Sequence, residues 1–401
     1  MSNKASSEEH GDTNRVQEGY LGTTPPLGQI PTRGQRVWVD RPEQLLLAFE
    51  QLKKAPVVAI DAEFTQARSH MQSSDASGPR LALLQLAIDG QCFVVDALRL
   101  RNLEPLNAVV DDPACLVLLH GAGADLRVMD ERGVNVAHYY DLEATSRSVF
   151  GQHESSLAAM LLRAFNMRLD KSLQRTDWTR RPLPPAMIAY AARDAEMTLA
   201  LYYWLQEHFA WALRLHESTN LAEPVATWIE PFLRGSQPMP ADVAVAEALK
   251  DGKLRDQAQV ADDCRQALAT LTHPMRKSRL LRLITDLSLT ELLPEIKALL
   301  QGATADERSG AIRTLSRIGG EEANELISPL LQDPVHDVRK AASTALHFSG
   351  PKEPRGQWAT PARGADGTRS WSVGESAANE TPETDDDDND WRARLRSFMG
   401  E

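Results

Sequence analysis

A hydrophobic segment that ends in two acidic residues is the feature that most limits how this chain can fold. Residues 57–64 read VVAIDAEF, in which a buried β-strand leads into Asp61 and Glu63. Successive side chains of a strand point to opposite faces, so these two carboxylates project to the same side. Carboxylates this close repel each other unless a positive charge lies between them. The segment therefore predicts either the start of a loop, where both acids reach water, or a site that holds a metal ion.

The segments around this strand show both strand and helix patterns. RVWVD (36–40) predicts a strand, and Pro42 begins a helix with apolar residues at helical spacing. LALLQLAI and QCFVVDAL predict a hairpin, because an Asp-Gly pair (89–90) between two β-rich runs favours a tight turn. CLVLLH (115–120) predicts another buried strand, followed by a helix, and residues 155–216 have helical periodicity. This order indicates an α/β domain with a mixed sheet.

Past Pro240 the patterns are helical only, and they repeat. LLQGATADERSGAIRTLSRIGG aligns with LLQDPVHDVRKAASTALHFSG, with Leu299 and Leu330 at equivalent positions 31 residues apart. A fainter copy precedes them, so the repeats extend over about 260–350. A helix pair of this size cannot bury its own apolar face, so neighbouring pairs must stack. The alternative is a coincidental likeness between amphipathic helices. Identical residues occupy four further pairs of positions: Arg308 and Arg339, Ala311 and Ala342, Leu315 and Leu346, Gly319 and Gly350.

The two ends of the chain differ in composition from the segments between them. Residues 1–35 are rich in Gly, Thr, Pro and charge, and residues 351–401 in Gly, Pro, Ser and acid, including TDDDDND at 384–390. Such composition predicts disordered tails around an α/β domain at 36–215 and a helical region at 216–350. The last segment, WRARLRSFMGE, has apolar residues at helical spacing, which fits either a short helix that docks on a partner or a frayed end.

Overall composition argues against several classes of protein. The formal net charge of −12 disfavours wholesale coating of nucleic acid or membrane. Cys92, Cys115 and Cys264 are widely spaced and odd in number, which predicts a reducing compartment without a disulfide framework. The N-terminal residues lack a signal-peptide pattern, and no run approaches the roughly 18 apolar residues of a membrane span. We therefore expect a cytoplasmic protein with no membrane partner.

Two more acidic positions accompany Asp61 and Glu63. Asp125, in HGAGADL, follows a buried strand and begins a helix, where the helix dipole by itself favours a negative charge. Tyr190 and Asp194, in YAARD, are four residues apart and share one helix face. Each acid alone fits an ordinary surface or capping position, so only their conjunction predicts a site.

DAEF (61–64), HGAGADL (120–126) and YAARD (190–194) together resemble the three exonuclease motifs of the DEDD superfamily, and the tyrosine resembles that of its DEDDy subclass. DKSLQRTDWTRRPL (170–183) resembles the segment before the third motif in ribonuclease D. This resemblance covers 36–215 and implies a ribonuclease H-like α/β fold. The helices that follow resemble HEAT repeats, so the expected fold class is a mixed-sheet exonuclease domain followed by an all-α repeat domain.

The resemblance implies a metal-dependent 3′-5′ exonuclease that trims RNA and releases nucleoside 5′-monophosphates. Two divalent ions, Mg²⁺ or Mn²⁺, stabilise the attacking and leaving oxygens in such chemistry and prefer carboxylate ligands. Asp61, Glu63, Asp125 and Asp194 would hold the ions. Tyr190 would orient the attacking water, because a phenol with a pKa near 10 is a poor base at neutral pH.

Further residues are candidates for contact with the substrate, each with a structural alternative. Core packing is the alternative for Phe64 and Trp178, a strand neighbour for Gln85, and a structural hydrogen bond for His120. Residues 163–181 carry an excess of cations that fits either a phosphate-binding surface or a solvated helix face. The candidates are Phe64, Gln85, His120, Lys171, Gln174, Arg175 and Trp178.

Two departures from ribonuclease D leave the substrate open. The loop at 65–80 is longer than usual, and HEAT-like repeats stand where a helicase-and-RNase-D C-terminal domain is expected. The repeats fit a surface for structured RNA or for a protein partner. One alternative function is an exonuclease on single-stranded DNA or short oligonucleotides. The other is a scaffold with a relic nuclease domain.

Overall fold

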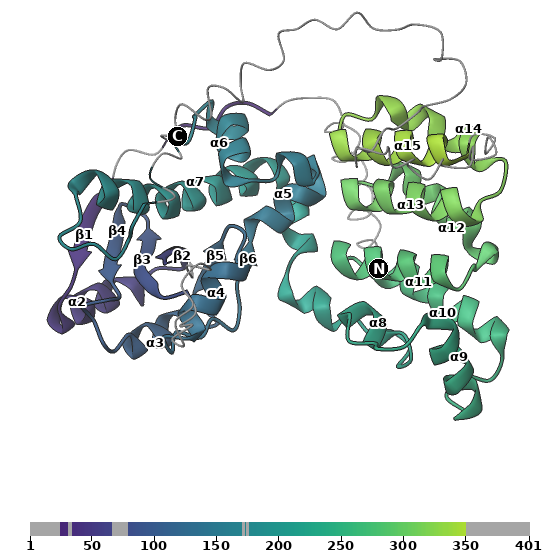
Figure 1. Ribbon diagram of the computed structural model, residues 1–401, viewed down its shortest axis with the longest axis horizontal. Helices are drawn as coiled ribbons and strands as arrows, with labels where there is room; N and C mark the ends of the chain where they lie inside the picture. The colour runs from purple at the N-terminus through teal and green to yellow at the C-terminus, as the bar shows by residue number, and fades with distance from the viewer. Residues whose placement is uncertain (1–24, 31–33, 66–78, 171–172, 174–175, 350–401) are drawn as a thin grey trace, which may run out of the picture. The chain divides into compact units, whose positions relative to one another are not determined.

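The computed structural model describes residues 25–30, 34–65, 79–170, 173 and 176–349 (Figure 1). Several predictions lie outside these residues. They concern most of the N-terminal tail, most of the loop at 65–80, the C-terminal tail with its terminal helix, and the side chains of Lys171, Gln174 and Arg175.

Within the described residues, six strands form one mixed sheet in the order β1-β4-β3-β2-β5-β6. Strand β3 is antiparallel to both of its neighbours, β2 and β4, whereas β1, β5 and β6 run parallel to β4, β2 and β5 respectively. The β3–β4 turn requires Gly90, whose φ is +75°. The strands are β1 (Gln35–Val39), β2 (Val57–Phe64), β3 (Leu81–Ile88), β4 (Gln91–Asp96), β5 (Leu116–Leu119) and β6 (Tyr140–Asp141).

Helices cover both faces of this sheet (Figure 1). Alternation along β2 sends Val58 and Ile60 into one core, with helices α2, α3 and α4, and sends Ala59 into the other, with α5, α6 and α7. Asp61 and Glu63 follow Ala59 at a spacing of two, so they point toward α7. The helices are α2 (Pro42–Leu52), α3 (Asn107–Val110), α4 (Gly123–Asp130), α5 (Leu142–Phe150), α6 (Leu157–Phe165) and α7 (Pro185–Leu215).

The predicted strands, hairpin and first helices of the α/β domain are confirmed. The prediction of helical structure throughout 155–216 is wrong between Phe165 and Pro185, where the described residues form turns and extended segments. Asn166 ends α6 in the left-handed conformation, with φ at 50°, and the prolines before α7 disfavour helix. Strand β6 has only two residues, too few to produce a period-two pattern.

Residues 241–349 are helical, as predicted past Pro240, and one apolar core runs through them. Hydrogen bonds within this region recur at the 31-residue spacing of the sequence repeat. Arg308 donates to the carbonyl oxygens of Gly302 and Ala303, and Arg339 donates to those of Asp333 and Pro334, each 31 positions later. The helices are α8 (Glu230–Arg234), α9 (Ala241–Lys250), α10 (Gln257–Thr270), α11 (Pro274–Asp286), α12 (Leu293–Ala298), α13 (Ala305–Ile318), α14 (Ala323–Ile327) and α15 (His336–Ser349).

The described residues up to His347 belong to one compact unit, in which the repeat helices contact the end of α5. Asp306 accepts a hydrogen bond of 2.9 Å from the Ser148 hydroxyl, and Asp337 accepts one of 3.1 Å from the backbone N–H of His153. Asp306 and Asp337 are equivalent positions of two successive repeats, so the same point of each repeat contacts the α/β domain.

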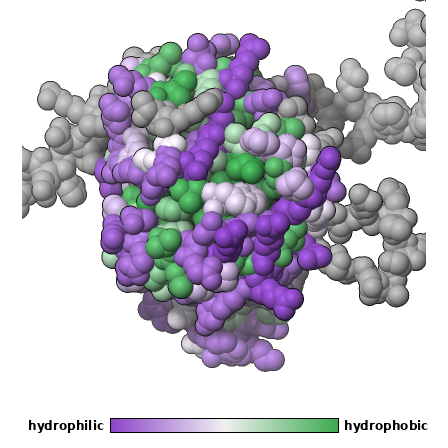
Figure 2. All heavy atoms as spheres, turned by 90° about the vertical axis from the view of Figure 1, so that its left-hand side faces the viewer, coloured by the Kyte–Doolittle hydropathy of each residue, from purple (hydrophilic) through white to green (hydrophobic). Residues whose placement is uncertain are grey.

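Polar residues separate the apolar ones on the face of the molecule at the β1 edge of the sheet (Figure 2). Helix α2 contributes Leu46 and Leu47 to the exposed apolar residues, with 55% and 70% of their surfaces accessible. Over the described residues, none of the helices has the length and apolar character to span a bilayer.

Candidate active site

Three carboxylates meet between the sheet and helix α7. Asp61 and Glu63 come from the central strand β2, and Asp194 comes from α7. One oxygen of each lies within 4.8 Å of the other two. The period-two spacing of β2 places the first pair on one face, and packing of α7 across that face supplies the third. This separation suits carboxylates that share a cation.

Asp125 belongs to the same electrostatic cluster but not to the tightest group. It lies in the first turn of α4, 9% exposed, and its charge acts on both Asp61 and Glu63. Asp141 holds the preceding turn, since its carboxylate accepts hydrogen bonds from the backbone N–H groups of Gly121 and Ala122. All four predicted acids are therefore close enough to repel one another.

Burial and mutual repulsion raise the pKa values of these acids. Burial raises the pKa of Asp61 well above its usual range, and Asp194, Asp125 and Glu63 raise it further. Burial, Asp194 and Asp125 raise the pKa of Glu63 to about 9, and burial with Asp141 raises the pKa of Asp125 to about 7. A divalent cation reverses this effect, because it favours the ionised form of its oxygen ligands. The donor set is all carboxylate, which fits Mg²⁺ or Mn²⁺ better than a soft metal.

Tyr190 lies one turn before Asp194 on α7 and is partly buried. Burial, followed by the charges of Asp194, Glu63 and Asp61, raises the pKa of its phenol. The phenol therefore stays protonated at neutral pH and can donate a hydrogen bond. A protonated phenol can orient a water molecule by donating this hydrogen bond.

Gln85 and His120, two candidates for substrate contact, have buried polar atoms. Gln85 lies beside Asp61, and His120 lies beside the turn that leads to Asp125. Gln85 pairs with Asp61 across β3 and β2, is fully buried, and has no hydrogen-bond partner for its amide among the described residues. His120 ends the segment before the Asp125 turn, and its Nε2 likewise lacks a partner there. Burial lowers the pKa of His120, so its ring is neutral at pH 7.

The two aromatic candidates pack into cores. Trp178 is 2% exposed in the core beneath α7, which leaves almost no ring surface for a nucleic-acid base. Phe64 follows a register shift in β2 and packs against the core of the opposite face. Both observations favour the core-packing alternative.

An ion pair that no local sequence pattern predicts joins Arg181 to Asp96. Arg181 was counted among the cations available for phosphate, yet it binds the fully buried carboxylate of Asp96 at 2.6 and 2.7 Å. One sequence signal does point to Asp96 as a buried acid: it ends the apolar run QCFVVD just as Asp61 ends VVAID. Its partner is 85 positions away, which no local pattern reveals.

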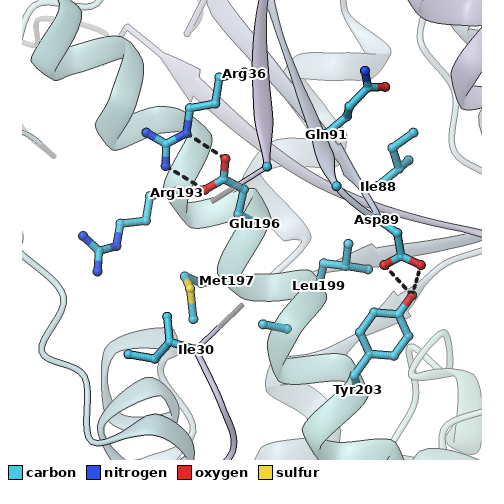
Figure 3. Close-up of a pocket in the computed structure, with 13 residues that line it drawn as sticks. Ile30, Arg36, Ile88, Asp89, Gln91, Arg193, Glu196, Met197, Leu199 and Tyr203 are labelled. Atoms are coloured by element: carbon cyan, nitrogen blue, oxygen red, sulfur yellow. Dashed lines mark hydrogen bonds and ion pairs between the residues drawn. The ribbon is translucent and has the colours of Figure 1, made fainter. Parts of the chain in front are cut away.

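A separate pocket of about 190 Å³ lies at the edge of the sheet, between the β3–β4 turn and α7 (Figure 3). Its charged groups are largely paired: Arg36 binds Glu196 through two hydrogen bonds of 2.7 Å, and the Tyr203 hydroxyl donates to Asp89. None of the five predicted catalytic residues lines it. The acidic cluster is therefore a different site.

Comparison with known proteins agrees with these observations. Residues 36–210 match the family model described as 3'-5' exonuclease. The chain is 33% identical to ribonuclease D of Gluconacetobacter diazotrophicus over 176 residues, which cover 43% of this chain and 42% of that protein. It is 31% identical to the exosome complex exonuclease RRP6 of Saccharomyces cerevisiae over 193 residues, or 47% of this chain and 25% of that protein. The chain thus spans less than half the length of these relatives, and the matches coincide with the α/β domain.

Proposed function

We propose that residues 36–210 form a ribonuclease D-like 3'-5' exonuclease domain, and that this chain hydrolyses RNA from its 3′ end and releases nucleoside 5′-monophosphates. The observation that carries the proposal is the meeting of Asp61, Glu63 and Asp194 within 4.8 Å. RNA is favoured over DNA because the similar proteins are named ribonuclease D and exosome exonuclease.

Each residue of the cluster has a role in this chemistry. Asp61, Glu63, Asp125 and Asp194 would hold two divalent ions, Mg²⁺ or Mn²⁺. Such a pair, when bound, lowers the pKa of the attacking water and offsets charge on the leaving oxygen. The Tyr190 phenol, protonated at neutral pH, donates a hydrogen bond that aligns the water for in-line attack.

Gln85 and His120 complete the proposed site. The Gln85 amide lies opposite Asp61 and has no hydrogen-bond partner among the described residues, so we assign it to a metal-bound water or to the substrate. His120 has a ring nitrogen, Nε2, near the Asp125 turn that finds no partner in the part of the chain that the structure describes. Lys171, Gln174 and Arg175 lie outside the described residues, and their contact with the substrate stays a prediction.

We further propose that the helical region consists of HEAT-like repeats and extends the binding surface for long or structured RNA, or for a protein partner. The equivalent hydrogen bonds of Arg308 and Arg339 support this assignment.

Cys92, Cys115 and Cys264 are buried free thiols, which agrees with a reducing cytoplasm.

The test uses a 5′-labelled single-stranded RNA incubated with the purified chain and Mg²⁺ or Mn²⁺. A ladder shortened from the 3′ end and release of 5′-monophosphates are expected, and a 3′-phosphate on the substrate should slow the reaction. Asp61→Asn removes one of the proposed metal ligands and should lower the rate at least about 10³-fold. A DNA of matched sequence decides between the two substrates. If the wild type and Asp61→Asn were equally inactive on the RNA and on the matched DNA, we would adopt the scaffold alternative.

A further inference from the structure

The ion pair between Asp96 and Arg181 links the end of strand β4 to the segment before α7. Asp96 ends β4, is fully buried, and faces α7 because it continues the alternation of Cys92 and Val94. Arg181 binds it with Nε at 2.6 Å and Nη2 at 2.7 Å, the two-pronged geometry that arginine forms best. The pair therefore fixes one point of the segment rigidly to the sheet.

Arg181 also holds the backbone of its own segment. Its Nη1 donates to the carbonyl oxygens of Trp178 and Arg180, both at 2.8 Å, and its Nη2 donates to that of Ala82 at 3.2 Å. One guanidinium thus joins the end of β4, the start of β3 and the turn that carries Trp178. Asp96 is fully occupied as well, since its Oδ1 accepts from the backbone N–H groups of Leu98 and Arg99.

The turn that Arg181 holds presents Trp178 to Tyr190. The two rings have centroids 6.1 Å apart and an interplanar angle of 33°. The buried indole N–H has no acceptor among the described residues, so the position of the ring depends on its backbone and on packing. The backbone oxygen of Trp178 is one of the atoms that Arg181 binds.

We propose that Arg181, with Asp96 as its anchor, is a positioning residue for Tyr190. The guanidinium fixes the Trp178 turn, the Trp178 ring forms a wall against the Tyr190 ring, and the wall sets where the phenol hydroxyl lies above the acidic cluster. This inference rests on the proposed function, in which Tyr190 aligns the attacking water. A misplacement of the phenol by about 1 Å would slow the chemical step without changing how RNA binds.

The kinetic test is a double-mutant cycle of Arg181→Lys and Tyr190→Phe, measured on a short RNA with Mn²⁺. Lysine keeps the charge but loses the two-pronged bond and the backbone bonds. Arg181→Lys should lower kcat by about 10- to 100-fold and leave KM within about twofold. In the Tyr190→Phe background, Arg181→Lys should lower kcat by less than about twofold, because the phenol hydroxyl that Arg181 positions is absent.

Arg132→Lys is the matched control, because Arg132 also binds backbone carbonyl oxygens, those of Ala97 and Leu100, but touches no residue of the site. It should lose stability and keep kcat. Equal losses of kcat from Arg181→Lys in both backgrounds, or a rise in KM at constant kcat, would overturn the proposal. If Arg181→Lys does not fold, Trp178→Phe takes its place in the same cycle.

A second readout does not depend on activity. The Trp178 ring shifts the NMR resonances of the Tyr190 ring, so Arg181→Lys should move them and Arg132→Lys should not. Unmoved Tyr190 resonances in folded Arg181→Lys would overturn the positioning role. An inactive wild-type protein would instead contradict the proposed function, and the NMR comparison would still decide the positioning role.

Discussion

The acidic cluster of the α/β domain and the paired charges of the helical region treat buried charge in opposite ways. Beneath α7, Asp61 and Glu63 lie among other carboxylates, and burial and those charges raise their pKa values. In the repeats, Arg308 and Asp333 are 3% and 4% exposed and bind each other at 2.7 and 3.1 Å. A buried pair of opposite charge serves the fold, whereas a buried cluster of one sign needs an external cation, and so marks a site.

Glu307 shows the same contrast in a single carboxyl group. Burial raises its pKa, but Lys277 at 2.7 Å and the Thr304 cap outweigh burial, so the pKa falls below its usual value. Glu63 experiences burial without a cation, and its pKa rises to about 9. The difference lies in the neighbours rather than in the amount of burial.

The largest effect on stability should come from breaking the repeat pair. Asp333→Ala leaves Arg308 buried without its partner, which should lower the free energy of unfolding by about 3–5 kcal/mol. Urea denaturation followed by circular dichroism measures this loss. A loss below about 1 kcal/mol would show that this pair is no different from a surface ion pair.

Divalent metal should stabilise the α/β domain and depend on its acidic cluster. At a Mn²⁺ concentration 100 times the dissociation constant, mass action adds about 2.7 kcal/mol to the stability of the native protein. Thermal denaturation with and without EDTA measures it. Asp61→Asn should abolish the gain, and Asp111→Asn, an exposed acid, should keep it. An equal gain in Asp61→Asn would contradict the placement of the metal site.

Acid should weaken the contact between the two regions through His216. Its Nε2 lies 3.0 Å from the Ser148 hydroxyl, which donates to Asp306, and its ring lies 5.3 Å from that of His273. Burial first, then His273 and Arg147, lower its pKa from 6.5 to about 3. The unfolded chain therefore binds more protons below pH 6.5, and stability falls as pH drops from there toward 3. At pH 5 the expected loss is about 2 kcal/mol relative to pH 7.5.

Urea denaturation at pH 7.5 and pH 5 measures this effect. His216→Gln should have a smaller pH-dependent loss, whereas His138→Gln, which changes an exposed histidine, should match the wild type. Identical losses in all three proteins would assign the acid sensitivity to other groups.

The smallest effect should be a gain in stability without metal. Asp61→Asn removes one of several repelling carboxylates, so in EDTA the free energy of unfolding should rise by about 1 kcal/mol. Asp333→Asn, in the paired region, should lower it. If Asp61→Asn, like Asp333→Asn, lowered the free energy of unfolding in EDTA, repulsion between the carboxylates of the acidic cluster would not destabilise the native protein.

Local patterns were enough to predict much of the fold and the identity of the acids. The alternation in VVAIDAEF places Asp61 and Glu63 on one face, the Asp-Gly turn joins β3 to β4, and the repeat between Leu299 and Leu330 identifies the stacked helices. These features depend on residues that are neighbours in the chain, where spacing alone decides direction.

Long-range placement was decided only by tertiary structure. The sequence places Tyr190 and Asp194 on one helix face, but only the packing of α7 on the sheet brings that face to Asp61. In the sequence, Arg181 is one of several cations in its segment, and only the tertiary structure shows that it binds Asp96. The physical reason is that repulsion, burial and ion pairing depend on distance in space, and chain spacing predicts that distance only within one strand, turn or helix.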